Sequence, residues 1–450
     1  MNDKHNRIAQ PLFLITFAIV FLIILSTLNL PKGYFNNLNK VDVFASVRAS
    51  KTNDSVLNSK INPLKSTGTS SHKFNSIPLK EVTLINDFEN DSINQLSLFF
   101  NKLDSAKYAG KKVRIAYFGD SFIEGDEITD ELRLQLQHSF GGSGIGFVPM
   151  QSAVSNLYTQ IKIDGSGWKD YNFRDNPNNF PLGLSGHLFY PKDDAETEYS
   201  SKLASPFSTI KLYTGFNNNG ISSISISKDG VNSTQNILSN ELINETILNK
   251  DSSVKSLKIS STIKSLPFYG ISFEANNGVY IDNYSFRGNT GLLTLQINEQ
   301  TMQALNKYLN YNLIIVHYGI NAVEHDKQRV LWFENGMNKL LNNLRKGFGN
   351  TPILLVSTSD RGYNYDGNYS TEKAIPYMVN NQMEIAKSNK TAFWNLYQAM
   401  GGENTMVKWV EGDTVFASKD YTHVNNKGAK RIGDLFFDKL IASKKYYQHN

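Results

Sequence analysis

Val113–Ser121 reads Val-Arg-Ile-Ala-Tyr-Phe-Gly-Asp-Ser, an apolar run that stops at a small, polar turn. Such a run is typical of a buried strand, and α/β sheets bind their ligands beyond the carboxyl ends of their strands. Glycine permits a tight turn, which leaves the serine exposed rather than packed. The stretch therefore predicts an α/β sheet that presents Ser121 at its edge. Because Gly, Asp and Ser are also ordinary turn residues, the rest of the chain must supply a base, an orienting acid and an oxyanion hole.

A candidate base and acid stand near the C-terminus, in Asp420-Tyr421-Thr422-His423, ahead of an amphipathic stretch from Ala429 to Ile441. An acid three residues before a histidine, in a loop that enters a helix, can accept a hydrogen bond from the imidazole Nδ1–H. This bond fixes the tautomer and stabilises the imidazolium that forms when Nε2 takes a serine proton. Of the eight histidines, only His423 has this setting. The alternative is a surface aspartate beside an unrelated histidine at a helix start.

Two further segments offer oxyanion donors. The apolar run that begins at Leu313 ends in Gly319-Ile320-Asn321, and a side-chain amide at the carboxyl end of a strand can donate to a developing oxyanion. A strand-like stretch from Val279 runs toward Gly288, whose backbone N–H is a second candidate donor because glycine permits close backbone approach. Asn321 is otherwise a plain turn residue.

In the order Ser, Gly, Asn and Asp-x-x-His, these four blocks resemble the SGNH (GDSL-type) hydrolase family. The resemblance implies that Ser121 is the nucleophile, His423 the general base and Asp420 the acid that orients it. It implies an oxyanion hole made by the backbone amides of Ser121 and Gly288 and the side chain of Asn321. It also implies a flavodoxin-like three-layer α/β sandwich around a parallel sheet, with no cofactor and no metal.

The match covers residues 110–148 and 279–443. The α/β-hydrolase elbow Gly-x-Ser-x-Gly does not fit, because position 123 is Ile. The sequence from Ser121 to Phe147, with Met400-Gly401-Gly402 and Trp409, is similar to one branch of the family, the peptidoglycan O-acetylesterases. This resemblance implies an inserted β-rich module.

Residues 150–275 have the pattern of that module. Alternation over 208–213, 221–226 and 254–259, with Asn, Gly and Ser turns between, predicts an antiparallel, jelly-roll-like β-sandwich. Four aromatic residues in this region are candidates to stack on sugar rings, with burial in the core as the alternative. They are Trp168, Tyr171, Phe173 and Tyr213.

Helix and strand patterns alternate elsewhere, as in a parallel sheet covered on both faces. Helices are expected at 93–103, 129–140, 326–346 and 371–388, and further strands at 352–357 and 392–396. Glu324, His325 and Asp326 read as a solvated helix start rather than as a metal site.

The N-terminal segment from Leu12 to Leu30 carries no charge and is long enough to span a membrane. No Ala-x-Ala-like cleavage site follows it, which favours an uncleaved signal anchor. We expect a single-pass protein of a bacterial inner membrane whose catalytic domain faces the periplasm. A cleaved signal peptide, and hence secretion, is the alternative.

The predicted organisation thus has four parts. Residues 1–30 are a cytoplasmic stub and transmembrane anchor, 31–85 a flexible spacer rich in Asn, Ser, Lys and Thr, 86–149 and 276–450 the hydrolase domain, and 150–275 the inserted module.

Composition narrows the function further. The formal charge of +5 is spread along 450 residues without a basic stripe, so nucleic acid is not expected as a partner. The chain has no cysteine, which excludes disulfides, cysteine zinc ligands and thiol catalysis.

The leading hypothesis is a serine esterase that removes O-acetyl groups from a cell-envelope polysaccharide, most naturally peptidoglycan, through an acyl-enzyme. An O-acetyltransferase that uses the same triad is the second hypothesis, with a sugar hydroxyl in place of water. A non-catalytic glycan-binding protein on a hydrolase scaffold is the third. The expected partners are the O-acetylated polysaccharide and, through the N-terminal helix, the membrane.

Overall fold

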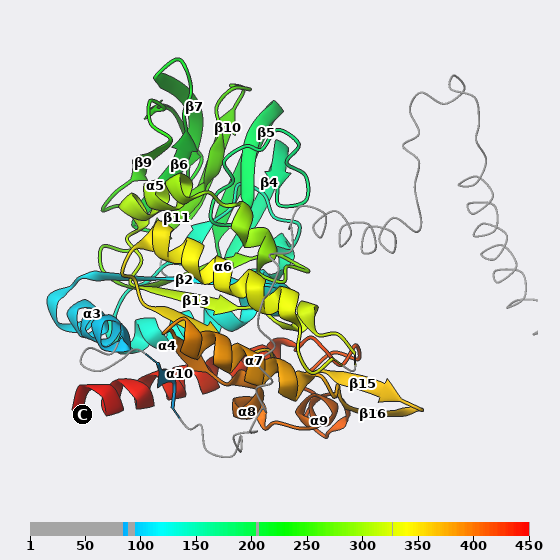
Figure 1. Cartoon of the computed structure of the whole chain (residues 1–450). Helices are drawn as coiled ribbons and strands as arrows, with labels where there is room; N and C mark the ends of the chain where they lie inside the picture. Colours follow the sequence, from blue (N-terminus) through cyan, green and yellow to red (C-terminus); the bar gives the residue numbers. More distant parts are fainter. Residues whose placement is uncertain (1–83, 89–94, 204–206, 326, 450) are drawn as a thin grey trace, which may run out of the picture. The chain divides into compact units, whose positions relative to one another are not determined.

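Six strands form the central sheet of the computed structural model, in the order β1-β17-β14-β13-β2-β12 (Figure 1). All neighbours pair in parallel except β1, which is antiparallel to β17. Numbered along the chain, the five parallel strands lie in the order 2-1-3-4-5, which is the flavodoxin-like order. The strands are β1 (Asn86–Asp87), β2 (Lys112–Gly119), β12 (Gly278–Ser285), β13 (Leu313–His317), β14 (Ile353–Val356) and β17 (Ala392–Trp394).

The structure describes residues 84–88, 95–203, 207–325 and 327–449. Within these ranges no helix has the length and apolar character needed to cross a membrane. The predicted anchor at 12–30 lies outside them and stays a prediction, as does the spacer up to residue 83. Ile85, assigned to that spacer, is fully buried, and its N–H donates to Ser443 Oγ at 2.9 Å. The packed part of the chain therefore includes Ile85.

Helices cover both faces of this sheet and make three layers. Ile115 and Tyr117 of β2 pack among residues of α3, α4 and α10, whereas Ala116 and Phe118 pack among residues of α5, α6 and α7. This is the alternation that a strand buried on both faces requires. The two helical layers are α3 (Gln95–Ala109), α4 (Glu127–Phe140) and α10 (Asn426–His449), and α5 (Glu299–Leu309), α6 (Leu331–Phe348) and α7 (Ile375–Ser388). The short helices are η2 (Ser121–Asp126), η3 (Ser155–Leu157), η4 (Leu292–Gln296), η5 (Ile320–Ala322), α8 (Leu396–Met400) and α9 (Thr405–Glu411).

A second, antiparallel sheet of nine strands interrupts the chain between α4 and β12. Its path is β8-β7-β10-β5-β11-β6-β9, with β3 beside β11 and β4 beside β5. We call this region, residues 146–274, the β module. Its strands are β3 (Gly146–Val148), β4 (Ile161–Asn172), β5 (His187–Ser201), β6 (Thr209–Gly215), β7 (Ile221–Lys228), β8 (Val231–Leu238), β9 (Ile243–Asn249), β10 (Ser256–Ser261) and β11 (Phe268–Glu274).

The β module is one hydrogen-bonded sheet rather than the two separate sheets of the expected sandwich. The reason is β5, whose later part pairs with β10 while Phe189 near its start pairs with Phe268 of β11. Side chains from both halves of this sheet still share one apolar core. Three of the four aromatic candidates for sugar contact, Trp168, Phe173 and Tyr213, are buried, so the alternative of burial in the core is the one confirmed for them.

Two elements differ from the expectation in the C-terminal half. Helix α6 begins at Leu331 rather than near 326, because the chain before it runs as a loop against Ala374 and Tyr377 at the start of α7. A two-stranded hairpin, β15 (Gly362–Tyr365) and β16 (Asn368–Thr371), stands where no strand was expected and extends away from the central sheet (Figure 1).

Candidate active site

The nucleophile turn directly follows β2. Asp120 precedes the short helix η2, and its Oδ1 accepts a hydrogen bond from Phe122 N at 2.9 Å. Gly119 fits closely here, since an added Cβ would lie 2.7 Å from Ile123 Cδ1 and 3.1 Å from the carbonyl oxygen of His317. The turn leaves Ser121 partly exposed at the carboxyl end of β2. This is the point where the order of the parallel strands reverses, between β2 and β13, and open α/β sheets bind ligands at such a point.

Ser121, His423 and Asp420 form one hydrogen-bonded chain. Ser121 Oγ lies 2.9 Å from His423 Nε2, and His423 Nδ1 lies 2.7 Å from Asp420 Oδ2. An ionised carboxylate only accepts, so Nδ1 carries the proton and Nε2 is free to accept from the serine hydroxyl. The three predicted triad residues, 302 positions apart at the extremes, therefore meet in the arrangement of a nucleophile, a base and an orienting acid.

The loop around Asp420 keeps this carboxylate ionised. Its Oδ1 accepts hydrogen bonds from the backbone N–H groups of Thr422 and His423, each at 3.0 Å. Partial burial alone would raise the pKa of Asp420, but the hydrogen bonds from His423 and Thr422 outweigh it and lower the pKa. The acid is thus charged at neutral pH.

His317 is the other histidine close to this turn, and burial lowers its pKa to about 3. It is neutral at ordinary pH, and its Nδ1 lies 3.1 Å from Tyr117 OH. His317 is therefore a core residue of β13 and no rival to His423 as the base.

Asn321 lies beside the nucleophile turn on η5. Its Nδ2 donates to Asp120 Oδ2 at 3.0 Å and to the carbonyl oxygen of Asn289 at 3.3 Å. Asn289 is itself fully buried, and its Oδ1 accepts from Gly291 N at 2.8 Å. The structure thus brings the predicted amide donor to the serine's own turn and ties it to the turn that contains Gly288.

That turn, residues 286–289, runs alongside the nucleophile turn. Phe286 N donates to Gly119 O at 3.0 Å, which continues the pairing of β12 with β2. Gly288 adopts a φ of +71°, a conformation that favours glycine. Four of the five predicted site residues are joined by hydrogen bonds, directly or through Asp120. Gly288 is brought beside them by the flanking residues.

Asp120 is the residue of this site that the sequence did not single out. It is 2 % exposed, and burial raises its pKa to about 7 against the opposing hydrogen bond from Phe122 and the charge of His423. In the sequence, Asp120 reads only as an ordinary turn residue between Gly119 and Ser121. An acid that follows a buried strand without an intervening loop was the available indication, since such a residue ends up buried.

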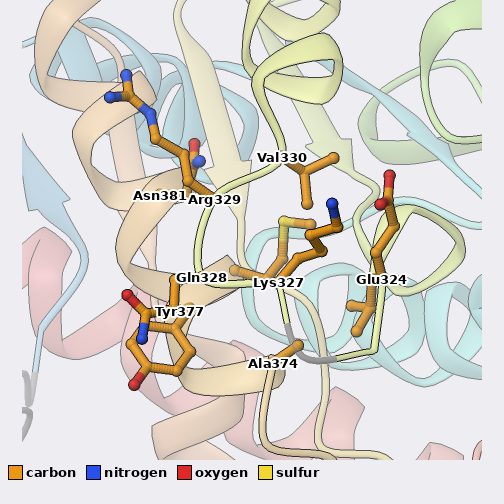
Figure 2. Close-up of a pocket in the computed structure, with 10 residues that line it drawn as sticks. Glu324, Lys327, Gln328, Arg329, Val330, Ala374, Tyr377 and Asn381 are labelled. Carbon is orange, nitrogen blue, oxygen red and sulfur yellow. The ribbon is translucent and has the colours of Figure 1, made fainter.

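A shallow hollow of about 200 Å³ lies between the segment that follows η5 and helix α7 (Figure 2). Figure 2 shows Lys327 and Glu324 on one wall and Tyr377 on the other. None of the triad residues lines it. Of the acidic group noted in the sequence, Glu324 borders this hollow, while His325 Nδ1 lies 3.0 Å from Glu372 Oε1. The described residues hold no group of three or more metal-ligating side chains.

Comparison with known proteins bears on the fold. No protein-family model matches the sequence, and no curated protein matches it. The solved structure of a peptidoglycan O-acetylesterase is similar to this chain, with a TM-score of 0.67 and 21% sequence identity, over 80% of this chain and 99% of that one. An acetyl xylan esterase (TM-score 0.27, 17% identity, 36% of this chain and 79% of that one) and a salicylyl-acyltransferase of a tetracycline pathway (TM-score 0.30, 12% identity, 64% and 96%) are too distant to carry an argument.

The likeness to the peptidoglycan O-acetylesterase extends over both sheets, because it covers four fifths of this chain. The strand order, the order of the four motifs and this likeness agree with one another. They identify the fold of this chain as that of the SGNH hydrolases.

Proposed function

We propose that this protein is a carbohydrate O-acetylesterase that removes acetyl groups from a cell-envelope glycan, with peptidoglycan as the substrate. The observation that carries the proposal is the hydrogen-bonded chain Ser121–His423–Asp420 at the switch point of the sheet. The likeness in fold to a peptidoglycan O-acetylesterase supports the choice of substrate.

In the proposed reaction Ser121 Oγ attacks the acetyl carbonyl carbon while His423 Nε2 takes its proton. Asp420 stabilises the imidazolium. The sugar hydroxyl leaves with that proton, and an acetyl group remains on Ser121. Water, deprotonated by His423, then attacks the acetyl-enzyme, and acetate leaves as Ser121 recovers its proton.

The oxyanion of each tetrahedral intermediate would accept hydrogen bonds from the backbone amides of Ser121 and Gly288 and from Asn321 Nδ2. Both Nδ2 protons of Asn321 have acceptors, so donation to the oxyanion would replace the longer hydrogen bond, the 3.3 Å one to Asn289 O. Asp120 would hold the amide in place through the shorter one.

Hydrolysis is favoured over transfer to a second sugar by the exposure of the base and its acid. The side chain of His423 is 38% exposed and that of Asp420 is 51% exposed, so water has access to the acyl-enzyme. A transferase that protects its acyl-enzyme from water needs these groups covered.

The test is acetate release from O-acetylated peptidoglycan by the full-length protein and by its Ser121→Ala variant. We expect Ser121→Ala to lower kcat by at least about 10³-fold. Release that survives the substitution would remove Ser121 from the mechanism. O-acetylated xylan serves as the second polymer, and faster release from xylan would contradict the choice of peptidoglycan.

The location of the enzyme is also a proposal. We infer that residues 12–30 anchor the chain in a bacterial inner membrane with the esterase in the periplasm, where its polymer is found. A mature protein that begins after residue 30 would instead establish a cleaved signal peptide and secretion.

A further inference from the structure

The turn between β4 and β5 of the β module lies against the 286–289 turn of the active site. Phe173 packs on Phe286 with ring centroids 5.0 Å apart, and Gln296 Nε2 donates to Phe173 O at 3.1 Å. Arg174 Nη2 donates to Arg287 O at 2.6 Å, and its guanidinium lies 5.5 Å from the centre of the Phe286 ring. The β module therefore reaches the turn that carries the predicted oxyanion donor.

Arg174 borders Gly288 itself. A Cβ added to Gly288 would lie 2.8 Å from Arg174 Nη2, and outside residues 287–289 no other described heavy atom would lie within 4 Å of it. The same turn is tied to the nucleophile side at both ends, through Phe286 N to Gly119 O and through Asn289 O to Asn321 Nδ2. The guanidinium of a residue from the β module is thus next to the site at which the acetyl ester would bind.

The charge at this place is unbalanced. Arg287 forms an ion pair with Glu124, yet 61% of its side chain is exposed. No ion pair joins Arg174 to any acid in the described ranges, and its neighbour Asp175 pairs with Lys169 at 3.2 Å. Of the two guanidinium groups only that of Arg287 is paired with a carboxylate, and Arg174 offers several N–H donors beyond the one that Arg287 O accepts.

We propose that Arg174 and Arg287 form a carboxylate subsite beside the oxyanion hole, and that the β module selects an acidic glycan by supplying Arg174. A guanidinium matches a carboxylate with two parallel hydrogen bonds, which gives the contact direction as well as affinity. The inference rests on the proposed esterase function and names the charge that its substrate must carry near the acetylated sugar.

The test compares two forms of one polymer. O-acetylated peptidoglycan is used as isolated and after its carboxylates are converted to neutral amides with carbodiimide and ammonia. The activity of the full-length protein and of Arg174→Gln is expressed as kcat/KM on each polymer, divided by kcat/KM on 4-nitrophenyl acetate. This ratio separates recognition of the polymer from the chemistry at Ser121.

We expect Arg174→Gln to lower the ratio for the native polymer about tenfold, since one charge-assisted contact is lost. Amidation should lower the wild-type ratio by a similar factor and change the ratio of Arg174→Gln by less than about twofold. Arg174→Lys keeps the positive charge but loses the two parallel N–H donors of the guanidinium. Its ratio should fall between those of the wild type and Arg174→Gln. Arg431→Gln, on the exposed face of α10, is the matched control for loss of an arginine.

Strands freed of peptide by an amidase carry only the carboxylate of the sugar. If the effect of Arg174→Gln persists on them, the subsite binds that carboxylate; if it disappears, the subsite binds a peptide carboxylate. A ratio that Arg174→Gln leaves at the wild-type value, or equal losses of both proteins on amidation, would overturn the proposal. Failure of the esterase function looks different, because the wild type would then release no acetate from either polymer.

Discussion

Asp120 is a carboxylate that the fold buries next to its own nucleophile. Its two oxygens accept from Phe122 N and Asn321 Nδ2, and burial raises its pKa to about 7. The ionised form is the one that accepts both hydrogen bonds, while the protonated form must give up one of them or rotate its proton away. The hydrogen bond from Asn321 Nδ2 to Asp120 is therefore sensitive to pH near neutrality.

This raised pKa has a definite sign for stability. The folded protein binds a proton on Asp120 up to about pH 7, whereas an unfolded aspartate loses it near its ordinary pKa of 3.8. The unfolded state thus binds fewer protons between these values, and the free energy of unfolding falls as pH rises through the window. The Asp120→Asn variant has no titrating group at this position, so it lacks this pH dependence of the free energy of unfolding.

We expect the stability of Asp120→Asn relative to the wild type to rise by about 1–4 kcal/mol between pH 4 and pH 8. Chemical unfolding at four pH values across this range measures it. Asp164→Asn is the control, because the side chain of Asp164 is 69% exposed. A difference between Asp120→Asn and wild type that does not change with pH would contradict the buried, titrating carboxylate.

Some residues of the site could be predicted from the sequence and others could not. The triad was predictable because Asp420, His423 and Ser121 occur in ordered motifs at strand and helix ends. Arg174 was not, since nothing in the local sequence indicates that a turn of the β module meets the 286–289 turn. Contacts between segments so far apart along the chain depend on packing, which no short pattern encodes.

Between single residues and the whole fold, the β15–β16 hairpin connects the two loops of the active site. Its strand pairing puts Tyr363 and Tyr369 on opposite faces, since Tyr369 pairs with Asn364. Tyr363 stacks on His325, four residues after Asn321, with ring centroids 4.6 Å apart. Tyr369 stacks on Tyr421 of the triad loop at 3.7 Å, with the rings within 3° of parallel.

Tyr421 sits between the acid and the base of the triad in a left-handed conformation, with a φ of +55°. Non-glycine residues adopt this conformation at a cost and hold it only where the surroundings fix it. Here the stack with Tyr369 and a 2.8 Å hydrogen bond from Gly362 N to Tyr421 O do so. The hairpin thereby positions the loop that carries Asp420 and His423.

We expect Tyr369→Ala to lower kcat on 4-nitrophenyl acetate about 2–10-fold, the equivalent of one lost aromatic stack. Tyr369→Phe keeps the ring and should restore the rate. Tyr363→Ala removes the ring on the opposite face and serves as the matched control. If Tyr363→Ala and Tyr369→Ala had equal effects, the hairpin would act through its overall stability and not through Tyr421.

Elements were predicted as well as their local patterns allowed. The strands expected at 208–213, 221–226 and 254–259 match β6, β7 and β10 to within a few residues. The hairpin was missed because its sequence from Gly362 to Thr371 is polar and rich in tyrosine, and its stability comes from stacking on His325 and Tyr421. Such stabilisation is tertiary and leaves no periodic pattern.

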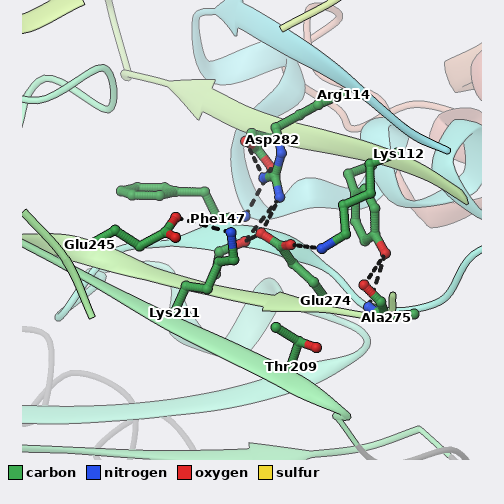
Figure 3. Close-up of polar contacts among 12 residues, drawn as sticks. Lys112, Arg114, Phe147, Thr209, Lys211, Glu245, Glu274, Ala275 and Asp282 are labelled. Atoms are coloured by element: carbon green, nitrogen blue, oxygen red, sulfur yellow. Dashed lines mark hydrogen bonds and ion pairs between the residues drawn. The ribbon is translucent and has the colours of Figure 1, made fainter. Parts of the chain in front are cut away.

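Across the whole molecule, a buried ion network joins the central sheet to the β module (Figure 3). Arg114 of β2 donates to Asp282 of β12 at 2.7 and 2.8 Å and also bonds Glu274 of β11. Phe147 N of β3 donates to Asp282 Oδ1 at 2.9 Å, and Lys112 Nζ lies 2.5 Å from Glu274 Oε2. Three of the four charged side chains are 5% exposed or less.

The network is costly to break from one side. Burial alone would raise the pKa of Glu274, but the charges of Arg114, Lys112 and Lys211 outweigh it and lower the pKa to about 2. Without Arg114, the two buried carboxylates would keep only the lysine charges of Lys112 and Lys211 against them. A lone arginine within the apolar run after Val113 was the one indication of this network in the sequence.

We expect Arg114→Met to lower the free energy of unfolding at pH 7 by about 3–5 kcal/mol, as for other buried pairs that lose one partner. Part of the loss should be recovered on acidification toward pH 4, because Arg114 no longer lowers the pKa of Glu274 in the variant. Lys162→Met breaks a pair whose side chains are 65% and 69% exposed and should change stability by less than about 1 kcal/mol. Chemical unfolding of the wild type and of the two variants measures these free energies. Equal losses for Arg114→Met and Lys162→Met would contradict a buried network.

The place of the β module in the chain bears on how the protein folds. Arg114 and Asp282 lie on adjacent strands yet are 168 residues apart in sequence, so pairing β2 with β12 directly would close a very long loop. The pairing of β3 with β11 brings the two ends of the β module together and shortens that closure. We therefore expect the β module to fold first and to draw β2 and β12 into register.

The triad is completed late in synthesis for the same reason of sequence distance. His423 follows Ser121 by 302 residues, so a nascent chain carries its serine without a base until His423 has been synthesised.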